Sequence, residues 1–146
     1  MASSRRKGRI LAFQALYFWE ASSQCVPVEE LVSFAWLEEE KFKSLDKSLI
    51  AFTNILIAGS IENIKEIDKI IIDHLENWDI TRLNRVDLAI LRMSSYSLMF
   101  QEEISPSIII DEAIGICREF GTDESYKFIN GVLDSIRETL QKKSHA

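Results

Sequence analysis

A long run of apolar residues, spaced three or four positions apart, most limits what this chain can fold into. It lies between residues 44 and 74 and consists of Leu49, Phe52, Leu56, Ile57, Ile61, Ile64, Ile67 and Ile71. Such spacing is typical of one face of an α-helix, and the strict alternation of a half-buried strand is absent. Although isoleucine also suits strands, the helical spacing persists throughout. We predict a long helix over 44–74, with Ser44 as its N-cap and Gly59 as a point where it could bend.

Shorter segments with helical spacing fill the rest of the chain. Further helices are predicted over residues 5–23, 28–40, 86–100, 105–121 and 122–141, with an irregular or single-turn piece over 78–84. Five glycines and two prolines are few for a chain that must turn often between short strands. With 146 residues and 47% hydrophobic composition, the chain can form one domain with a real core. The sequence therefore predicts an all-α fold.

The first helix has a clear inward stripe, and the last two helices carry specific signals at their ends. Phe13 and Tyr17 belong to the inward stripe of the first helix, together with Ile10, Ala12, Leu16 and Trp19. Pro106 suits the first turn of a helix, because its missing N–H has no partner there. Gly121 is a natural left-handed cap for that helix, and Thr122 can cap the last one.

The charge of the chain is unevenly distributed. The net charge is −6, yet the first 19 residues contain no acid and hold Arg5, Arg6, Lys7 and Arg9. Arg5 and Arg9 are four positions apart and would share one helix face. Four such cations can neutralise phosphates and release counterions, so the cluster indicates nucleic-acid binding. A solvated terminus that binds nothing is the alternative that the charge alone leaves open.

The turn between the last two predicted helices is a second candidate site. It places Phe120, Tyr126 and Phe128 close together with Lys127. Burial in the core is the default interpretation of each aromatic taken singly, but aromatics around an exposed turn also form a platform for unpaired bases. Asp123 and Glu124 would repel phosphate there. This turn would therefore contact bases or sugars rather than the phosphate backbone.

No catalytic site is expected. A cysteine nucleophile needs a histidine, and His74 and His145 are the two candidates for Cys25 or Cys117. No spacing typical of metal ligands or of a phosphate loop is present, so we expect no cofactor. Asp111 and Glu112 are neighbours on a helix, pointing about 100° apart, and cannot share a substrate. We expect one of the two to face solvent and the other to form a cap or a pair.

The compartment follows from the apolar runs and the cysteines. The longest apolar stretch, Ile10 to Trp19, is broken by Gln14, whereas a membrane span needs about twenty apolar residues. No cleavage site typical of a signal peptide follows it. The two cysteines have no metal-type spacing and are most simply reduced and packed. The default compartment is the cytoplasm, with no membrane partner.

Four motifs, in order along nearly the whole chain, resemble those of one bacterial family. They are Arg5-Arg-Lys-Gly-Arg with Ala12-Phe-Gln-Ala-Leu-Tyr17, Arg85-Val-Asp-Leu-Ala-Ile-Leu-Arg92, Ile110-Asp-Glu-Ala-Ile114, and Phe120-Gly-Thr-Asp-Glu-Ser-Tyr-Lys-Phe-Ile-Asn-Gly-Val-Leu-Asp134. In these motifs the chain resembles the NusB family of bacterial transcription antitermination factors. The resemblance implies an all-α fold of about seven helices. It also implies a single domain over 1–146, in two three-helix halves, approximately 5–76 and 77–141, that share one core.

The resemblance also implies a function. Together with NusE, a small-subunit ribosomal protein, the chain would bind the single-stranded boxA element of ribosomal RNA operon transcripts. The antitermination complex with RNA polymerase would then read through terminators. Whether the free protein is a monomer or a homodimer that hides its RNA face does not follow from the sequence.

The family's contacts can be carried over by position. RNA contacts fall on Arg5, Arg6, Lys7, Arg9, His74, Phe120, Glu124 and Phe128, and NusE contacts fall on Arg85, Val86 and Asp87. Lys127 is added to the RNA contacts because it lies in the aromatic turn. His74 aligns only through a one-residue shift, and Glu124 stands where the family commonly has aspartate. The physical roles are coherent, because single-stranded RNA is recognised by bases stacked on aromatics and by hydrogen bonds to base edges. Asp87 could alternatively be a first-turn acid stabilised by the helix dipole.

Two other classes of function stay open. In one, the chain is a helical protein–protein adaptor whose basic N-terminus is incidental. In the other, it is a hydrolase or transferase, which would require a pocket that gathers His74 with Cys25 or Cys117. The antitermination factor, which is not an enzyme, is the function that we predict.

Overall fold

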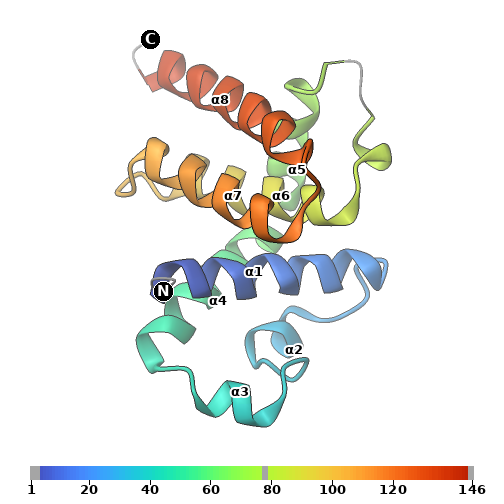
Figure 1. The fold of residues 1–146 in the computed structure, drawn as a ribbon, viewed down its shortest axis with the longest axis vertical. Coiled ribbons are helices and arrows are strands. Elements are labelled where there is room, and N and C mark those ends of the chain that lie inside the picture. Colours follow the sequence, from blue (N-terminus) through green and yellow to red (C-terminus); the bar gives the residue numbers. More distant parts are fainter. Residues whose placement is uncertain (1–3, 77–78, 145–146) are drawn as a thin grey trace.

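The computed structural model describes residues 4–76 and 79–144, and every regular element in these ranges is a helix (Figure 1). Within them the α-helices are α1 (Ser4–Ala21), α2 (Val28–Val32), α3 (Glu39–Lys43), α4 (Lys47–Glu62), α5 (Ile64–Asp73), α6 (Arg85–Phe100), α7 (Pro106–Phe120) and α8 (Ser125–Ser144). A short 3₁₀ helix covers Ile80–Arg82, inside the segment predicted to be irregular; Trp78 lies outside the described residues. The all-α class is confirmed.

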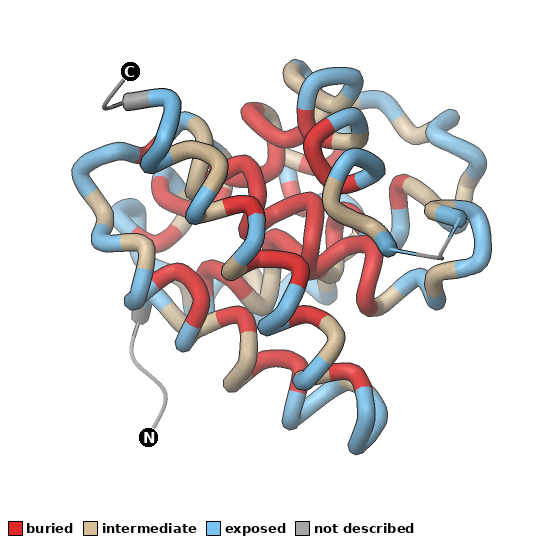
Figure 2. Tube along the Cα trace, turned by 90° about the horizontal axis from the view of Figure 1, so that it is seen from above, coloured by how far each residue is buried: buried red, intermediate tan, exposed pale blue. Residues whose placement is uncertain are grey.

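Helix α1 lies in the middle of the molecule. It packs against α4 and against α6, and in Figure 1 α2 and α3 lie on one side of it while α7 and α8 lie on the other. Its inward residues Ala12, Ala15 and Leu16 are fully buried and join Ile57, Leu91, Ile116 and Leu133 in one core. Figure 2 shows the buried residues concentrated at the centre of the fold. No helix in the described ranges combines the length and the apolar run that a membrane span requires.

The predicted helix over 28–40 is wrong, because the chain forms two short helices there. Phe34 follows α2 with φ of 60°, a left-handed conformation that ends the helix. This conformation buries the Phe34 ring, which lies 5.8 Å from the Trp36 ring and 5.7 Å from the Phe42 ring. Tertiary packing of three aromatics therefore overrides the local helical pattern.

The predicted helix over 44–74 is also two helices, and its predicted cap was wrong. Ser44 ends α3, whereas the Asp46 side chain caps α4 by accepting from the Leu49 N–H at 2.7 Å. The break falls at Asn63, whose side-chain amide donates to the Gly59 carbonyl at 2.8 Å. Gly59 itself lies inside α4, where the Tyr96 ring of α6 packs directly on it. Its missing side chain thus permits close helix packing rather than a bend.

The connection between α7 and α8 also differs from expectation. Gly121 ends α7 with φ of −96° and ψ of −169°, which is extended rather than left-handed. A Cβ on Gly121 would lie 2.7 Å from the Cys117 carbonyl oxygen, so the absence of a side chain matters here through close approach. Helix α8 begins at Ser125, and the Thr122 hydroxyl lies 2.8 Å from the Ser125 hydroxyl. Pro106 occupies the first turn of α7, as predicted.

Candidate nucleic-acid interface

The basic end of α1 is a packed part of the fold. Arg5 and Arg9 share one helix face, as predicted, and their guanidinium carbons lie 4.3 and 5.2 Å from the centre of the Phe52 ring of α4. Arg5 and Lys7 are exposed, but only 5% of Arg9 is exposed. Because charge next to an aromatic face is stabilised, these contacts hold the arginines in place. They are not the contacts of a frayed terminus.

Arg6 points to a different neighbour. Its Nε donates to the Glu112 carboxylate of α7, and its guanidinium packs against Gly115. Asp111, the neighbour of Glu112, is exposed, so the prediction that one of these acids would pair and the other would face solvent is confirmed. The cluster is therefore divided, with Arg5 and Arg9 on the α4 side of α1 and Arg6 on the α7 side.

The burial of Arg9 perturbs its electrostatics. Loss of solvent lowers the pKa of the Arg9 guanidinium, and the neighbouring charges of Arg5 and Arg6 lower it further, while Glu112 acts in the opposite direction. An arginine remains charged even so. A buried cation beside two others attracts an anion that can approach from solvent.

The predicted aromatic turn, between α7 and α8, contacts α1 farther along that helix. Phe120 is 38% exposed, and its ring contacts the Phe13 ring of α1 at 5.2 Å between centroids. Phe13 follows Arg6 by seven residues, which corresponds to about 10 Å along a helix. The structure thus places Phe120 against the same helix as the basic cluster, but about two turns away from Arg6.

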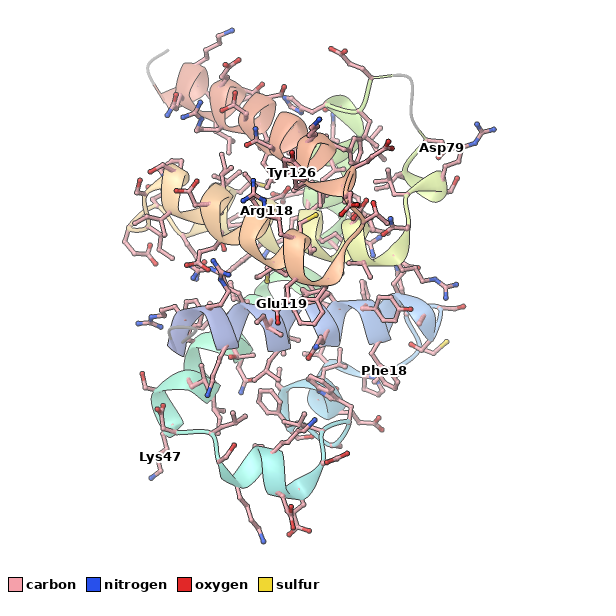
Figure 3. All side chains as sticks on the ribbon, viewed as in Figure 1. Phe18, Lys47, Asp79, Arg118, Glu119 and Tyr126 are labelled. Atoms are coloured by element: carbon pink, nitrogen blue, oxygen red, sulfur yellow. The ribbon has the colours of Figure 1, made fainter. Side chains whose placement is uncertain are left out.

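The other residues of the turn divide between surface and core. Glu124 and Lys127 are exposed, and Phe128 is half-buried against the core. Tyr126 lies under the Arg118 guanidinium at 4.8 Å, an arrangement that Figure 3 shows on α7 and α8. Tyr126 therefore has a partner within the fold, and Phe120 is the more open of the predicted stacking residues.

His74 does not lie in either cluster. Its Nδ1 is 2.7 Å from the Ile70 carbonyl oxygen, and its Nε2 is 2.7 Å from the Thr139 hydroxyl of α8. Because a carbonyl oxygen only accepts, we assign the proton to Nδ1. Both ring nitrogens are thus engaged, and the Nε2 contact joins the end of α5 to α8.

The cysteines do not form a catalytic pair with His74. Cys25 is exposed, Cys117 is buried, and His145 lies outside the described residues. Burial, with a contribution from the Asp87 charge, raises the pKa of the Cys117 thiol to about 11. A cysteine nucleophile needs a lowered pKa, so the structure argues against the hydrolase or transferase alternative.

Asp87, which the resemblance places among the NusE contacts, is buried in the structure. Only 6% of it is exposed, and its Oδ2 accepts from the Asn84 amide and from the Ser125 hydroxyl, both at 3.1 Å. Its Oδ1 is buried without a hydrogen-bond partner among the described residues. Burial raises the pKa of this carboxyl, and the two hydrogen bonds oppose the shift. Asp87 therefore ties the start of α6 to the first residue of α8.

The structure brings the predicted turn and the predicted partner residues together. A cavity of about 310 Å³ is lined by Arg82, Leu83, Asn84, Asp87, Thr122, Glu124, Ser125 and Phe128. Next to it, a groove is lined by Tyr17, Asn84, Arg85, Val86, Phe120, Gly121 and Thr122. The two share Asn84 and Thr122, so one continuous surface joins them.

Tyr17 was missed by sequence reasoning. It was expected in the inward stripe of the first helix, but it is exposed and lines the groove with Arg85 and Val86. Helical periodicity places a residue on an approximate face only, and Tyr17 lies at the edge of the buried stripe. Its polar tip on an apolar ring is typical of interface residues, a signal that could have singled it out.

Comparisons with known proteins identify the family of this chain. Residues 6–138 match the model of the NusB family. The transcription antitermination protein NusB of Treponema denticola is 50% identical over 137 residues, 94% of this chain and 98% of its own length. That of Geobacter sulfurreducens is 42% identical over 141 residues, 96% of this chain and 98% of its own length.

Solved structures extend the likeness to three dimensions. The structure of T. maritima NusB is 35% identical with a TM-score of 0.82, covering 94% of this chain and 93% of that one. A crystal structure of the antitermination factors NusB and NusE in complex with double-stranded RNA gives 29% identity and a TM-score of 0.82, covering 95% of this chain and 99% of that one. Sequence, chain length and helical fold thus agree, and the chain belongs to the NusB family.

Proposed function

We propose that this protein is a transcription antitermination factor that binds the boxA RNA of ribosomal RNA transcripts together with NusE, and so promotes read-through by RNA polymerase. It would act by binding, not by catalysis, in the cytoplasm where transcription takes place. The names of its relatives and the solved complex of NusB, NusE and RNA support this proposal.

The position of Phe120 is the observation that carries the proposal. Its exposed ring packs on α1, the helix with the basic cluster, and also lines the groove with Arg85 and Val86. A base stacked on Phe120 would thus lie between cations that bind phosphate and a surface that can bind a protein. An RNA and a protein partner bound there would be neighbours, and each would raise the affinity of the other.

The proposed roles differ among the residues. Arg5, Arg6, Lys7 and Arg9 would bind the backbone, and Phe120 and Phe128 would stack on bases. Glu124 would accept from base edges, and Lys127 would contact base edges or nearby phosphates. Arg85, Val86 and Tyr17 would meet NusE. We assign Asp87 a positioning role, because it holds Ser125 and hence the turn. His74 would act indirectly, through the contact between α5 and α8.

The domain organisation is part of the same proposal. Residues 5–76 would form one half and residues 77–141 the other, sharing the core that surrounds α1 and α6. Helix α1 packs on α4 of its own half and on α6 of the other half, which supports the shared core.

Fluorescence anisotropy with labelled boxA-type and scrambled single strands, with and without NusE, tests the function. We expect preferential binding of boxA that strengthens with NusE. Phe120→Ala should weaken it by about 1–3 kcal/mol, and Arg6→Ala should lower the salt slope by about one. Phe18→Ala is the matched control, because Phe18 is an exposed aromatic of α1 that lines neither the groove nor the cavity beside it.

The same assay distinguishes the proposed RNA-binding function from the protein–protein adaptor alternative. Equal affinity for boxA and scrambled RNA, with and without NusE, would contradict the proposal. A stable complex with NusE that is indifferent to RNA and to removal of residues 1–9 would favour the adaptor instead.

A further inference from the structure

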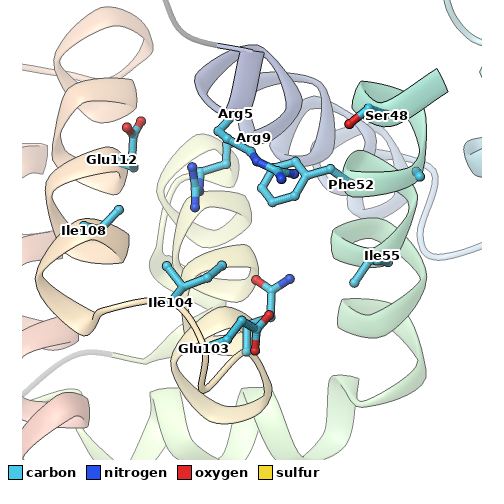
Figure 4. Close-up of a pocket in the computed structure, with 11 residues that line it drawn as sticks. Arg5, Arg9, Ser48, Phe52, Ile55, Glu103, Ile104, Ile108 and Glu112 are labelled. Carbon is cyan, nitrogen blue, oxygen red and sulfur yellow. The ribbon is translucent and has the colours of Figure 1, made fainter. Parts of the chain in front are cut away.

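A second hollow lies on the α4 side of α1, away from Phe120. It is an open cavity of about 660 Å³, a size typical of ligand pockets. Its walls come from α1, α4, α7 and the turn between α6 and α7, and the residues are Arg5, Arg9, Ser48, Ala51, Phe52, Ile55, Gln101, Glu103, Ile104, Ile108 and Glu112. Figure 4 shows the two arginines at one wall, with Ile104 and Glu103 facing them.

Arg9 is the most informative residue of this cavity. Its side chain is buried and contacts Phe52, yet no hydrogen bond or ion pair joins its guanidinium to any residue between 4 and 76 or between 79 and 144. A buried charge is usually paired or hydrogen-bonded, because its desolvation is otherwise costly. Arg5, beside the same ring, adds a second cation. The pair is thus prepared for an anion that enters from the cavity.

The acids of the cavity do not cancel this charge. Glu112 is paired with Arg6, and its single charge stands against the three cations Arg5, Arg6 and Arg9. Glu103 lies exposed on the turn across the cavity. Its carboxylate could accept from an exocyclic amine of a base instead of repelling a phosphate held at the opposite wall.

The remaining wall is apolar and open to solvent. Ile55 and Ile108 are each 51% exposed, and Ile104 between them is half-buried. Exposed isoleucines next to arginines match the two parts of a nucleotide, whose phosphate is charged and whose base has an apolar face.

We propose that this cavity is a nucleotide subsite of the RNA surface, in which Arg5 and Arg9 bind one backbone phosphate and the adjoining base packs on Ile55, Ile104 and Ile108. The inference rests on the proposed RNA-binding function and extends it along α1, from Phe13 and Phe120 to the first turns of the helix. An RNA strand would then cross the first turns of α1, with Arg6 between the two base sites.

Matched isoleucine variants test the subsite. Ile108→Glu places a negative charge at the apolar wall, and Ile72→Glu does the same at an isoleucine of α5 that is 49% exposed and lines none of the described cavities. We expect Ile108→Glu to weaken binding of a boxA-type single strand at least about fivefold, the lower end for one lost base contact. Ile72→Glu should leave the affinity unchanged. Arg9→Gln should lower the salt slope by about one.

A second measurement does not depend on any variant's folding. In the full chain with ¹³C-labelled isoleucine δ1-methyl groups, RNA should shift the signals of Ile55, Ile104 and Ile108 through the ring current of a base, and leave that of Ile72 in place. If RNA binds with boxA preference but these methyl signals do not move, the subsite is overturned while the proposed function stands. If no RNA binds even with NusE, the proposed function itself fails.

A second copy of this chain could cover the same apolar wall. Sedimentation velocity would then show a homodimer that Ile108→Glu, but not Ile72→Glu, converts to monomer, with the RNA affinity of the monomer unchanged. That result would overturn the nucleotide subsite. A monomeric wild type with a selective loss of RNA binding in Ile108→Glu would support it.

Discussion

Arg92 binds Asp68 through two parallel hydrogen bonds, from Nε to Oδ1 and from Nη2 to Oδ2, each of 2.9 Å. The third contact of this buried guanidinium is with Glu20 Oε1, at 2.7 Å from Nη1. Burial alone would lower the pKa of Arg92, but the hydrogen bonds and charges of Asp68 and Glu20 outweigh it and raise the pKa above its ordinary value. The network joins α6 to α5 and to α1, so it holds the central helix in place.

We expect Asp68→Asn to lower the free energy of unfolding by about 3 kcal/mol, because it leaves a buried guanidinium incompletely paired. Asp73→Asn is the control, since it removes an exposed ion pair with Lys69 on the same helix and should cost less than about 0.5 kcal/mol. Urea unfolding at neutral pH measures both values. Equal losses for the two variants would mean that the Arg92 network contributes no more than a surface pair.

Two helix glycines should respond to alanine with opposite signs. In Gly59→Ala the new methyl group would overlap the buried Tyr96 ring, and we expect a loss of about 1–3 kcal/mol in unfolding free energy. Around Gly131 of α8 no atom would lie within 4 Å of the new methyl, so Gly131→Ala should stabilise by up to about 1 kcal/mol. Thermal unfolding of both variants compares them directly. If both substitutions destabilise the protein, helix propensity does not determine the effect at Gly131.

The buried carboxyl of Asp87 should give an unusual pH dependence. Because its folded-state pKa lies above the unfolded value of 3.8, protonation favours the folded state. This gain appears as the pH falls through the folded-state pKa and is complete below the unfolded value. The Asp87→Asn variant lacks this gain in stability, because asparagine does not titrate. We therefore expect this variant to lose stability relative to the wild type as the pH is lowered from 7 towards 4.

Asp79 provides the control of opposite sign. The Thr81 N–H lowers the pKa of its carboxyl, so its contribution is present above pH 3.8 and is lost as the pH falls further. The stability difference between Asp79→Asn and the wild type should shrink in that range. Urea unfolding between pH 7 and pH 3 tests both variants, and parallel pH profiles would argue against the Asp87 assignment.

The two thiols should differ sharply in reactivity. Cys117 is buried with its pKa raised to about 11, so it carries little thiolate at pH 8, whereas Cys25 is exposed. We expect a thiol reagent to label one cysteine per chain in the native protein and two in denaturant. Cys25→Ser should abolish the native labelling. Rapid native labelling of Cys25→Ser would show that the α7–α8 end opens easily.

The helical class and the candidate surfaces could be predicted because their signals are local. Three-four spacing revealed most helices, and the cations of residues 5–9 with the aromatics of 120–128 indicated nucleic acid. Boundaries were less accurate, since the break at Phe34 depends on the packing of its ring against Trp36 and Phe42, and the break at Asn63 on its bond to the Gly59 carbonyl.

By itself, the sequence determined that the chain is all-α, that it resembles the NusB family, and which residue types its binding surface could use. Only the tertiary structure decided which of these residues are exposed on the surface. It buried Arg9 against Phe52, exposed Tyr17, and turned Asp87 inward to Ser125, 38 positions away. Periodicity reports one helix at a time, whereas exposure depends on which distant helices pack beside it.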